Sequence, residues 1–448
     1  MHIDFLFEVF EESKDRQAII WKTDIMDYQW LIDRTNYWIN EIERLMIEKG
    51  AVVVVEGDFS PNTISILLAL TEKECIIVPI STMTKRNEEQ LFEISQVEYR
   101  FCFADNDEVQ FEELAKRSDN ELYSVLWERS HPGLVLFSSG TSGEPKAAVH
   151  DFCGLLEKFK TRRNSMRTLN FLLFDHWGGL NTMLHILSNG GVVITSKDRS
   201  PDKICKLIER HQIELLPASP TFLNLILISQ AYKDYDLDSL KVISYGTEPM
   251  PITTLNALKL NFPNVRLLQT YGLIELGVMR SKSEKDDSLW VKIGGEGYQT
   301  RIVDGILQIK AESAMLGYLN APSPFTDDGW FITGDEVLQK GEYIKILGRK
   351  SEIINVGGDK VYPQEVENII LEMENVSDIT VYGEKNQLLG NIVCAKVNLQ
   401  KEEPKKDFTI RLKKHCSEKL QKFKIPVKVV FVKENQYNNR FKKSRTNQ

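Results

Sequence analysis

The segment LVLFSSGTSGEPK, residues 134–146, brings together the residue types that bind phosphate. A β-type run leads into a loop whose two glycines let the backbone turn tightly, so that several N–H groups can point at one anion. Hydroxyl groups add hydrogen-bond donors, and a lysine adds positive charge. The residues of this phosphate loop are Ser139, Gly140, Thr141, Ser142, Gly143 and Lys146. Their types and spacing predict a phosphate-binding site.

This loop differs from the phosphate-binding loop of kinases and GTPases. That motif has a glycine directly before the lysine, and Pro145 stands at this position here. A Ser/Gly cluster is more often a solvated turn between two strands, so the cluster alone would not decide the matter. The complete string with its lysine favours phosphate binding over a plain turn.

The surrounding chain alternates between apolar, β-rich runs and amphipathic stretches. The runs AVVVVEG (51–57), CIIVPIS (75–81), GVVITS (191–196) and KVISYG (241–246) predict strands, whereas residues 202–213 predict a helix. Strands that alternate with helices are typical of an α/β fold with largely parallel sheets.

Two further regions follow the α/β part. Residues 298–313 predict two strands joined by an Asp-Gly turn, and hence a smaller β-rich piece. Beyond it, a helix signal at residues 363–374 and strand signals at 378–384 and 391–399 predict a compact α+β domain of about 100 residues. We therefore expect an N-terminal domain at residues 1–348 and a C-terminal domain at residues 349–448.

Composition excludes several classes of function. The formal net charge of -8 over 448 residues argues against general binding to nucleic acid or to an anionic membrane surface. The sequence lacks the run of about 18 apolar residues that a membrane helix needs, and its N-terminus carries acids where a signal peptide carries bases. We therefore expect a cytoplasmic protein without membrane insertion. Six scattered cysteines, without a CxxC pair or a His/Cys cluster at metal spacing, predict reduced and mostly buried thiols.

Four more segments follow the phosphate loop: SYGTEPM (244–250), YGLIELG (271–277), GWFITGDEV (329–337) and GRKSEIINVGGDKVYPQEVE (348–367). Together with the loop they resemble, in the same order, the motifs of the adenylate-forming superfamily. That superfamily includes acyl-CoA synthetases, firefly-type luciferases and the adenylation domains of peptide synthetases. One such match is weak, but five in order are specific. The resemblance covers nearly the whole chain and is closest to small acyl-CoA ligases and acyl-carrier-protein ligases.

The resemblance implies a fold and an activity. The fold is an α/β N-terminal domain, with two mixed parallel sheets, helices and a small β-barrel-like subdomain, followed by a small mobile α+β domain. The activity is ATP- and Mg²⁺-dependent conversion of a carboxylic acid to an acyl-adenylate with release of pyrophosphate. The acyl group then passes to a thiol, either that of coenzyme A or that of phosphopantetheine on a carrier protein.

The resemblance also assigns nucleotide-binding residues. Glu275 matches the glutamate that helps to hold Mg²⁺, Asp335 the aspartate that accepts hydrogen bonds from both ribose hydroxyls, and Arg349 a second ribose contact. Thr141, Ser142, Gly143 and Lys146 match the residues at the β and γ phosphates. The other residues implied for ATP are Gly246, Thr247, Glu248, Tyr271 and Gly272. Without the resemblance, Glu275 would be a solvated side chain and Asp335 part of an ordinary turn.

The C-terminal domain of the superfamily swings between two poses, one for adenylation and one for thiol transfer. The resemblance places the hinge at Lys350-Ser351 and a thiol tunnel at Gly357 and Gly358. The tail NNRFKKSR corresponds to the segment that carries the adenylating lysine, although the family's glycine and proline are absent. Lys442 is the predicted catalytic residue because its distance to the following arginine matches the family interval. Lys443 and a frayed basic tail remain alternatives.

The acyl pocket is expected at FDHWGG, residues 174–179, with Asp175, His176, Trp177 and Gly178 as its residues. An aspartate here binds the substrate amino group in amino-acid-activating relatives. The glycine pair and the downstream residues instead favour the CoA-ligase type and an aliphatic or aryl acid. Trp177 either narrows the pocket or belongs to the core.

Three alternatives stay open at this point. The chain could be a stand-alone enzyme that activates an amino acid, or one that passes the adenylate to water, oxygen or an amine. It could also be a degenerate nucleotide-binding protein without catalysis. Ile274 and Ser351, where the family has a threonine and an acid, would be signatures of the degenerate protein. The retained charged residues argue against it, because a buried charge without a ligand is costly.

Overall fold

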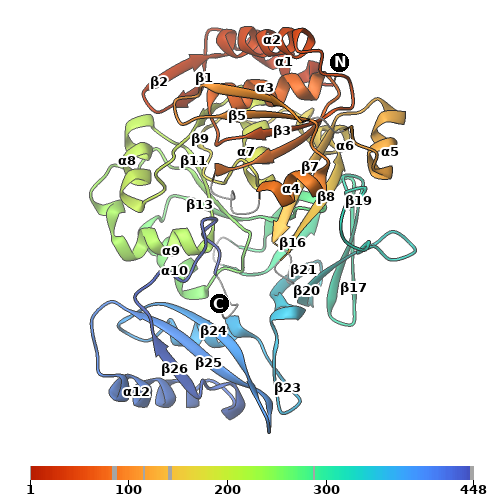
Figure 1. Cartoon of the computed structure of the whole chain (residues 1–448). Coiled ribbons are helices and arrows are strands. Elements are labelled where there is room, and N and C mark those ends of the chain that lie inside the picture. The colour runs from red at the N-terminus through yellow and green to blue at the C-terminus, as the bar shows by residue number, and fades with distance from the viewer. Residues whose placement is uncertain (1, 83–87, 115–116, 140–143, 286–287, 444–448) are drawn as a thin grey trace.

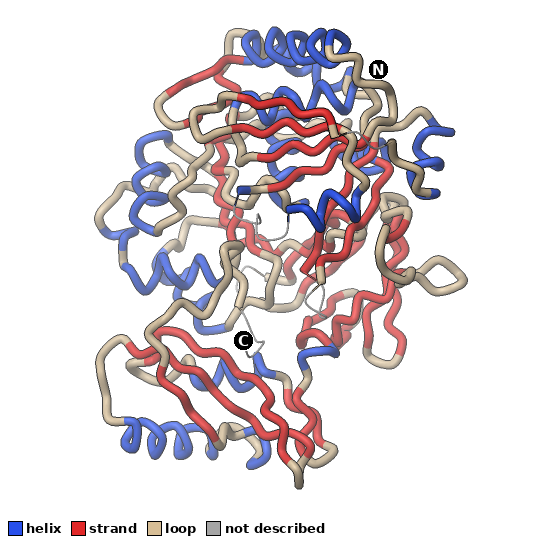
Figure 2. The backbone as a smooth tube through the Cα atoms, viewed as in Figure 1, coloured by secondary structure: helices blue, strands red, loops and turns tan. Residues whose placement is uncertain are grey.

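The structure is a computed structural model that describes residues 2–82, 88–114, 117–139, 144–285 and 288–443. Sheets and helices form a large body at the top of Figure 1, and a smaller body lies below it. The secondary structure of both bodies can be followed in Figure 2.

The first sheet of the large body has seven strands in the order β13-β12-β11-β9-β10-β1-β2 and is parallel except for β2. Its strands are β1 Gln17–Trp21, β2 Asp24–Asp27, β9 Arg167–Leu169, β10 Val192–Ile194, β11 Leu215–Ala218, β12 Val242–Tyr245 and β13 Arg266–Gln269. The strands predicted at 191–196 and 241–246 are therefore confirmed as β10 and β12. The connections between parallel strands pass through helices, as an α/β fold requires.

The second sheet is mixed, with the order β19-β8-β7-β4-β3-β5-β6. Its strands are β3 Val52–Glu56, β4 Ile76–Ile80, β5 Tyr99–Phe103, β6 Val109–Glu113, β7 Gly133–Ser139, β8 Pro145–Asp151 and β19 Gly317–Tyr318. Every residue of β3 and β4 is buried, which explains why both were predicted from continuous apolar runs. The phosphate loop joins β7 to β8 at one end of this sheet.

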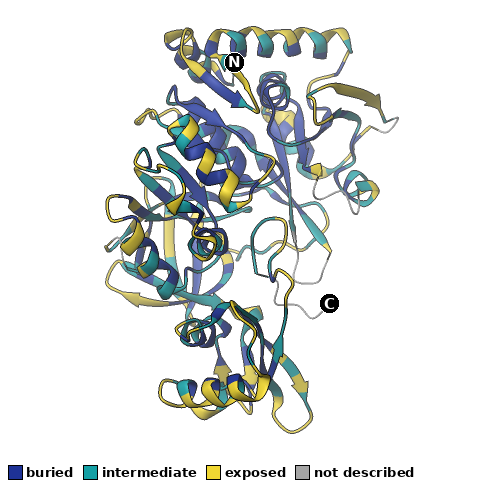
Figure 3. Ribbon diagram, turned by 90° about the vertical axis from the view of Figure 1, so that its left-hand side faces the viewer, coloured by how far each residue is buried: buried dark blue, intermediate teal, exposed yellow. Residues whose placement is uncertain are grey.

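Ten helices of the described chain cover the two sheets. They are α1 Asp4–Glu12, α2 Tyr28–Arg44, α3 Pro61–Glu72, α4 Glu88–Ser95, α5 Glu121–Arg129, α6 Phe152–Leu156, α7 Trp177–Leu187, α8 Pro201–His211, α9 Pro220–Ser229 and α10 Ile252–Asn261. α8 confirms the helix predicted at 202–213. α3 and α7 are buried on nearly all sides, whereas α2 keeps an exposed face, as Figure 3 shows.

The predicted β-rich piece is a third sheet of seven antiparallel strands, in the order β14-β15-β16-β21-β20-β18-β17. Its strands are β14 Tyr271–Leu273, β15 Gly277–Ser283, β16 Val291–Gly294, β17 Tyr298–Val303, β18 Ile306–Ala311, β20 Phe331–Lys340 and β21 Tyr343–Arg349. The turn between β17 and β18 is Asp304-Gly305, and both residues have positive φ. This is the backbone that a two-residue hairpin needs, so the predicted hairpin is confirmed.

The small body has its own sheet and its own apolar core. Its elements are β22 Ile354–Val356, β23 Asp359–Val361, α11 Pro363–Ile370, β24 Val376–Asn386, β25 Gly390–Leu399, α12 Lys405–Ser417 and β26 Lys428–Phe431. A 3-10 turn at Lys350–Glu352 follows β21 and connects the two bodies. The predicted hinge falls in this turn. The domain boundary at residue 349 stays a prediction, and β21 runs up to that residue.

None of the helices in the described ranges combines the length and the apolarity needed to cross a membrane. All six cysteines are free, and four of them are buried.

Candidate active site

The segment after β26 returns to the large body and forms a small hairpin at residues 437–443, which we call the tail hairpin. In Figure 1 it belongs to the dark blue chain that turns up toward α9 and α10. The Asn438 N–H donates to the Lys442 carbonyl at 2.9 Å, and the Phe441 N–H donates to the Asn438 carbonyl at 2.9 Å. Tyr437 pairs with Lys443 across the hairpin. The end of the described chain is therefore ordered by its own backbone hydrogen bonds.

Phe441 anchors the tail hairpin in the large body. Its ring lies 5.4 Å from the ring of Phe171 and 5.2 Å from the ring of Phe222, measured between centroids. The Ser219 hydroxyl donates to the Phe441 carbonyl at 2.8 Å. Aromatic packing and a hydrogen bond from the Ser219 side chain thus hold the tail hairpin against α9 and the segment that follows β9.

An ion pair ties the same hairpin to the predicted acyl segment. A guanidinium nitrogen of Arg440 lies 3.0 Å from Oδ2 of Asp175, and the side chains are 19% and 7% exposed. Oδ1 of Asp175 has no hydrogen-bond partner among the described residues. The carboxylate that sequence comparison offered as a ligand for a substrate amino group is therefore paired with the protein's own arginine.

The two adjacent tail lysines have different surroundings. Burial, together with the charge of Arg440, lowers the pKa of Lys442 to about 8, although Glu248 and Glu275 act in the opposite direction. Lys443 instead turns to the small body, where its ammonium donates to the Ile379 carbonyl at 2.7 Å and lies 3.1 Å from Asp378. Lys442 thus lines a cleft with His176, whereas Lys443 contacts the small body, and the choice of Lys442 as the catalytic lysine stays a prediction.

His176 lies beside Lys442 at the start of α7. Burial, and then the charges of Lys442 and Arg440, hold the pKa of His176 well below its usual value, so that the ring is neutral. Nδ1 of His176 accepts a hydrogen bond from the Gly178 N–H at 2.9 Å and caps α7. A narrow cleft opens here. It is lined by Phe171, Leu172, Leu173, His176, Arg199, Thr247, Asn439, Arg440, Phe441 and Lys442.

Tyr271, Asp335 and Arg349 form a second group. The Tyr271 hydroxyl donates to Oδ2 of Asp335 at 2.5 Å, and Nε of Arg349 lies 3.5 Å from Oδ1. Asp335 and Arg349 are also direct partners across β20 and β21. Burial raises the pKa of Asp335, while Arg349 and Tyr271 act to lower it. The sheet thus holds a largely buried carboxylate with an arginine at its open side, which suits a vicinal diol.

Glu275, Tyr318 and Lys146 form a third group at the phosphate loop. The Tyr318 hydroxyl donates to Oε1 of Glu275 at 2.6 Å. The ammonium of Lys146 lies 5.5 Å from the centroid of the Tyr318 ring. A carboxylate and a lysine, positioned through one tyrosine, therefore lie at the base of the loop. Such a pair can accept a metal–phosphate group between them.

The segment 246–248 lies where β12 ends, close to the tail hairpin. A Cβ on Gly246 would lie 2.5 Å from the hydroxyl of Thr270, so only glycine fits there. Thr247 has a φ of 71°, which is rare for a β-branched residue and is stored strain at a candidate binding site. Glu248 accepts hydrogen bonds from the Thr221 N–H at 2.8 Å and the Lys443 N–H at 3.2 Å. Glu248 therefore connects α9 with the tail.

The remaining predicted residues are placed as follows. Gly140, Thr141, Ser142 and Gly143 lie outside the described residues; Ser139 ends β7 and pairs with Pro145 of β8. Gly272 lies in β14, where a Cβ would meet the Gly277 carbonyl at 3.0 Å.

Gly357 and Gly358 form the tight turn between β22 and β23 and have positive φ. Both are exposed, and a Cβ on Gly357 would contact only Leu389 of the same body. The structure does not bring this turn together with Lys442, so the thiol tunnel stays a prediction.

Sequence reasoning missed Arg440 and Tyr318. Both act through contacts between distant segments, and no local pattern marks them. The basic tail was noticed, but it carried no sign of which cation would pair with Asp175.

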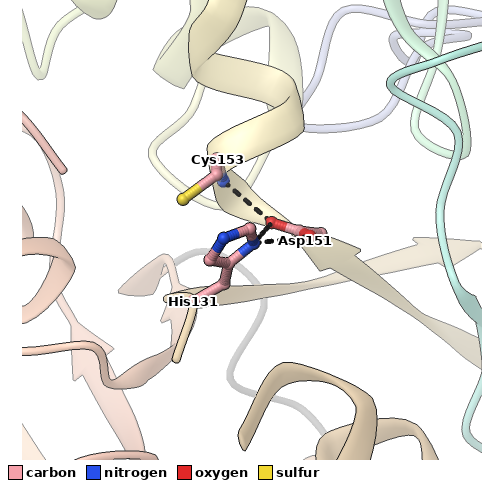
Figure 4. Close-up of side chains that lie close together, drawn as sticks. All are labelled: His131, Asp151 and Cys153. Carbon is pink, nitrogen blue, oxygen red and sulfur yellow. Dashed lines mark hydrogen bonds and ion pairs between the residues drawn. The ribbon is translucent and has the colours of Figure 1, made fainter. Parts of the chain in front are cut away.

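A cluster of possible metal ligands lies elsewhere, at the start of α6. One possible ligand atom from each of His131, Asp151 and Cys153 lies within 4.8 Å of the other two. Figure 4 shows the three side chains close together. The Asp151 carboxylate already accepts hydrogen bonds from Arg129, from Nδ1 of His131 and from the Cys153 N–H. Asp151 therefore serves as the N-cap of α6. The spacing of these three residues in the sequence did not predict the cluster.

Comparison with known families gives a match along most of the chain. The family model described as AMP-binding enzyme matches residues 6–305, and that described as AMP-binding enzyme C-terminal domain matches residues 365–442.

Several curated relatives are CoA ligases by name. A 3-[(3aS,4S,7aS)-7a-methyl-1,5-dioxo-octahydro-1H-inden-4-yl]propanoyl:CoA ligase of Rhodococcus jostii is 29% identical over 319 residues, which are 66% of this chain and 61% of the relative. An indoleacetate–CoA ligase of Aromatoleum aromaticum is 28% identical over 331 residues, 68% of this chain and 64% of the relative. These matches span less than two thirds of the relatives' length.

Solved structures share the fold along nearly the whole chain. The anthranilate CoA ligase AuaEII in complex with anthranoyl-AMP superposes with a TM-score of 0.83 at 18% identity, covering 99% of this chain and 95% of that one. ATP-bound MatB from Rhodopseudomonas palustris superposes with a TM-score of 0.80 at 21% identity, covering 98% and 97%. On the strength of the matching family models, this chain belongs to the AMP-binding enzyme family.

Proposed function

We propose that this chain is an ATP-dependent acid–thiol ligase, which converts a carboxylic acid to its acyl-adenylate, releases pyrophosphate and transfers the acyl group to coenzyme A. One observation carries the proposal: the tail hairpin docks on the large body so that Lys442 and His176 line the same cleft. Burial of a lysine is unfavourable, so a nucleotide-binding protein without catalysis would not be expected to keep one in this cleft. The named CoA-ligase relatives support the same reaction.

The chemistry follows from the charges. A carboxylate attacks the α-phosphate of ATP only if the negative charge that crowds this phosphate is neutralised. In this proposal Lys442 supplies that positive charge, while Lys146 and the phosphate loop hold the pyrophosphate end. Asp335 and Arg349 bind the ribose hydroxyls and fix the nucleotide. Tyr271 positions the Asp335 carboxylate through its hydrogen bond.

Mg²⁺ fits the donor set near the loop. Glu275 offers a carboxylate oxygen, the ligand type that Mg²⁺ prefers, and its other oxygen is already oriented by Tyr318. When bound, Mg²⁺ neutralises charge on the phosphates. The acceptor follows from the relatives, which are CoA ligases by name; phosphopantetheine on a carrier protein presents the same thiol and is the second acceptor to test. The free cysteines support a cytoplasmic setting.

The amino-acid-activating alternative needs a free carboxylate in the acyl segment. Asp175 is paired with Arg440 in the pose that presents Lys442. A substrate ammonium would have to displace this arginine at the moment of adenylation. We therefore propose a carboxylic acid without an amino group, rather than an amino acid, as the substrate class.

The test is ATP–pyrophosphate exchange with a panel of fatty, aryl, dicarboxylic and amino acids. Wild-type protein is compared with Lys442→Ala and with Lys443→Ala as the matched control. We expect exchange with one class of acid, a loss of at least about 100-fold in Lys442→Ala, and a change below about threefold in Lys443→Ala. Formation of acyl-CoA from the same acid completes the second half-reaction. Tight ATP binding without exchange for any acid would instead identify a non-catalytic nucleotide-binding protein.

A further inference from the structure

Lys158 is a cation in the acyl region without an acidic partner. It lies in the 3-10 turn Glu157–Phe159 after α6, and its ammonium donates to the Val278 carbonyl at 2.9 Å. The same ammonium lies 5.9 Å from the ring of Trp177. No carboxylate of the described chain forms an ion pair with it. Val278 lies three residues after Glu275, the proposed Mg²⁺ ligand. The Lys158 ammonium therefore lies between α7, which carries Trp177, and the segment that carries Glu275.

The two charged groups that shift the pKa of Lys158, Arg163 and Arg280, are both positive. Burial, followed by the charges of Arg163 and Arg280, lowers the pKa of Lys158 to about 7. Burial together with Arg163 and Lys158 likewise lowers the pKa of His185 to about 4. Arg163 and Arg280 are exposed, so the cluster extends from the interior toward the surface. A positive group that is both desolvated and surrounded by cations attracts an anion strongly.

The neighbouring face of α7 has polar atoms that the protein leaves without partners. Trp177, Asn181 and His185 follow one another at intervals of four residues and so share one face of the helix. Trp177 is 2% exposed, yet its Nε1 has no hydrogen-bond partner among the described residues. Oδ1 of Asn181 is also buried and also lacks a hydrogen-bond partner among them. Nε1 of Trp177 lies 3.4 Å from where a Cβ on Gly277 would stand. Buried polar groups of this kind are rare unless something else binds them.

We propose that Lys158 and this polar face of α7 form the far end of the acyl site and bind a second anionic group of the substrate, so that the preferred acid is a dicarboxylic acid. The inference rests on the proposed function, because the second group belongs to the acid that is activated. A second carboxylate satisfies the Lys158 ammonium and accepts from Nε1 of Trp177. A plain alkyl end would leave the Lys158 charge without a counter-charge and Nε1 of Trp177 without an acceptor.

The experiment compares linear and aromatic dicarboxylic acids with their monomethyl esters, which keep the shape but lose the second charge. Exchange gives kcat/KM for each pair with wild-type protein, Lys158→Met, Lys158→Arg and Lys160→Met. Lys160 is the matched control because it lies in the same segment, exposed and paired with Glu157.

For wild-type protein we expect the free diacid to be preferred over its ester by about tenfold or more, the size of a charge-assisted hydrogen bond. Lys158→Met should abolish this preference while its activity with the ester stays within about threefold. Lys158→Arg should keep the preference, as should Lys160→Met. An equal or better rate with the ester in wild-type protein, or an unchanged preference in Lys158→Met, overturns the inference without touching the proposed ligase activity.

A binding measurement separates the two proposals. If no acid supports exchange, the ligase activity falls, and calorimetry with the diacids alone still tests the subsite. Binding that is weaker by about tenfold in Lys158→Met than in wild-type protein supports it. Equal binding to both proteins, or none to either, refutes it.

Discussion

Arg440→Met tests whether the ion pair with Asp175 positions the tail for adenylation. The substitution keeps most of the aliphatic stem and removes the charge that faces a 7% exposed carboxylate. Loss of one partner of a fully buried pair costs about 3–5 kcal/mol. Because 19% of the Arg440 side chain is exposed, we take about 2 kcal/mol against the docked tail. That energy corresponds to a factor of about 30 in the equilibrium constant for docking of the tail, which is the largest loss expected in the population that presents Lys442.

The assay measures the two half-reactions separately. Pyrophosphate exchange should fall by up to about 30-fold, whereas transfer from a supplied acyl-adenylate to coenzyme A should change by less than about threefold, since it does not use Lys442. Asp175→Asn should behave similarly, and the double variant Asp175→Asn/Arg440→Gln should lose no more than either single variant. Lys433→Met, which breaks an exposed pair near the tail, is the control. Equal losses in both half-reactions, or additive losses in the double variant, would refute the positioning role.

Three further predictions follow from the same site. The pKa of Lys442 is lowered to about 8, so exchange should decline as the pH rises through about 8 and the ammonium loses its proton. Lys442→Arg should shift this decline to above about pH 10. An unshifted pH profile would assign the decline to another group. Tyr271→Phe removes the hydrogen bond to Asp335 and should raise the KM for ATP by about tenfold, measured at saturating acid; an unchanged KM would remove Asp335 from the ribose site. Phe441→Ala removes the ring that anchors the tail and should lower exchange by about tenfold while Tm stays within about 2 °C; a large fall in Tm would show a role in the core instead.

The fold was largely predictable wherever one physical requirement governs a segment. β3 and β4 are buried on both faces, and such strands need continuous apolar β-branched residues, which the sequence displays openly. The Asp304-Gly305 turn was predictable because few residue pairs accept positive φ twice. β1 and β2 were not predicted, since β1 is short and pairs with the distant β10, and β2 is mostly exposed with an aspartate at each end.

The site was predictable only in part, for a related reason. The motifs indicated Asp335, Arg349 and Tyr271, and the structure brings all three together. Arg440 contacts a residue 265 positions away, and Tyr318 one 43 positions away. Such contacts depend on how complete elements are packed, and a single sequence carries no local trace of them.

The pairing of Asp175 with Arg440 also limits how the segment at residues 174–179 and the C-terminal tail can diverge. A substitution at either position alone leaves a charge without its counter-charge in a largely buried place, so the two positions should change together among related sequences. The same dependence between positions 175 and 440 applies to chimaeras made by exchanging C-terminal segments between relatives. A transplanted tail should work in a new host only where the host residue at position 175 complements the residue it brings at position 440.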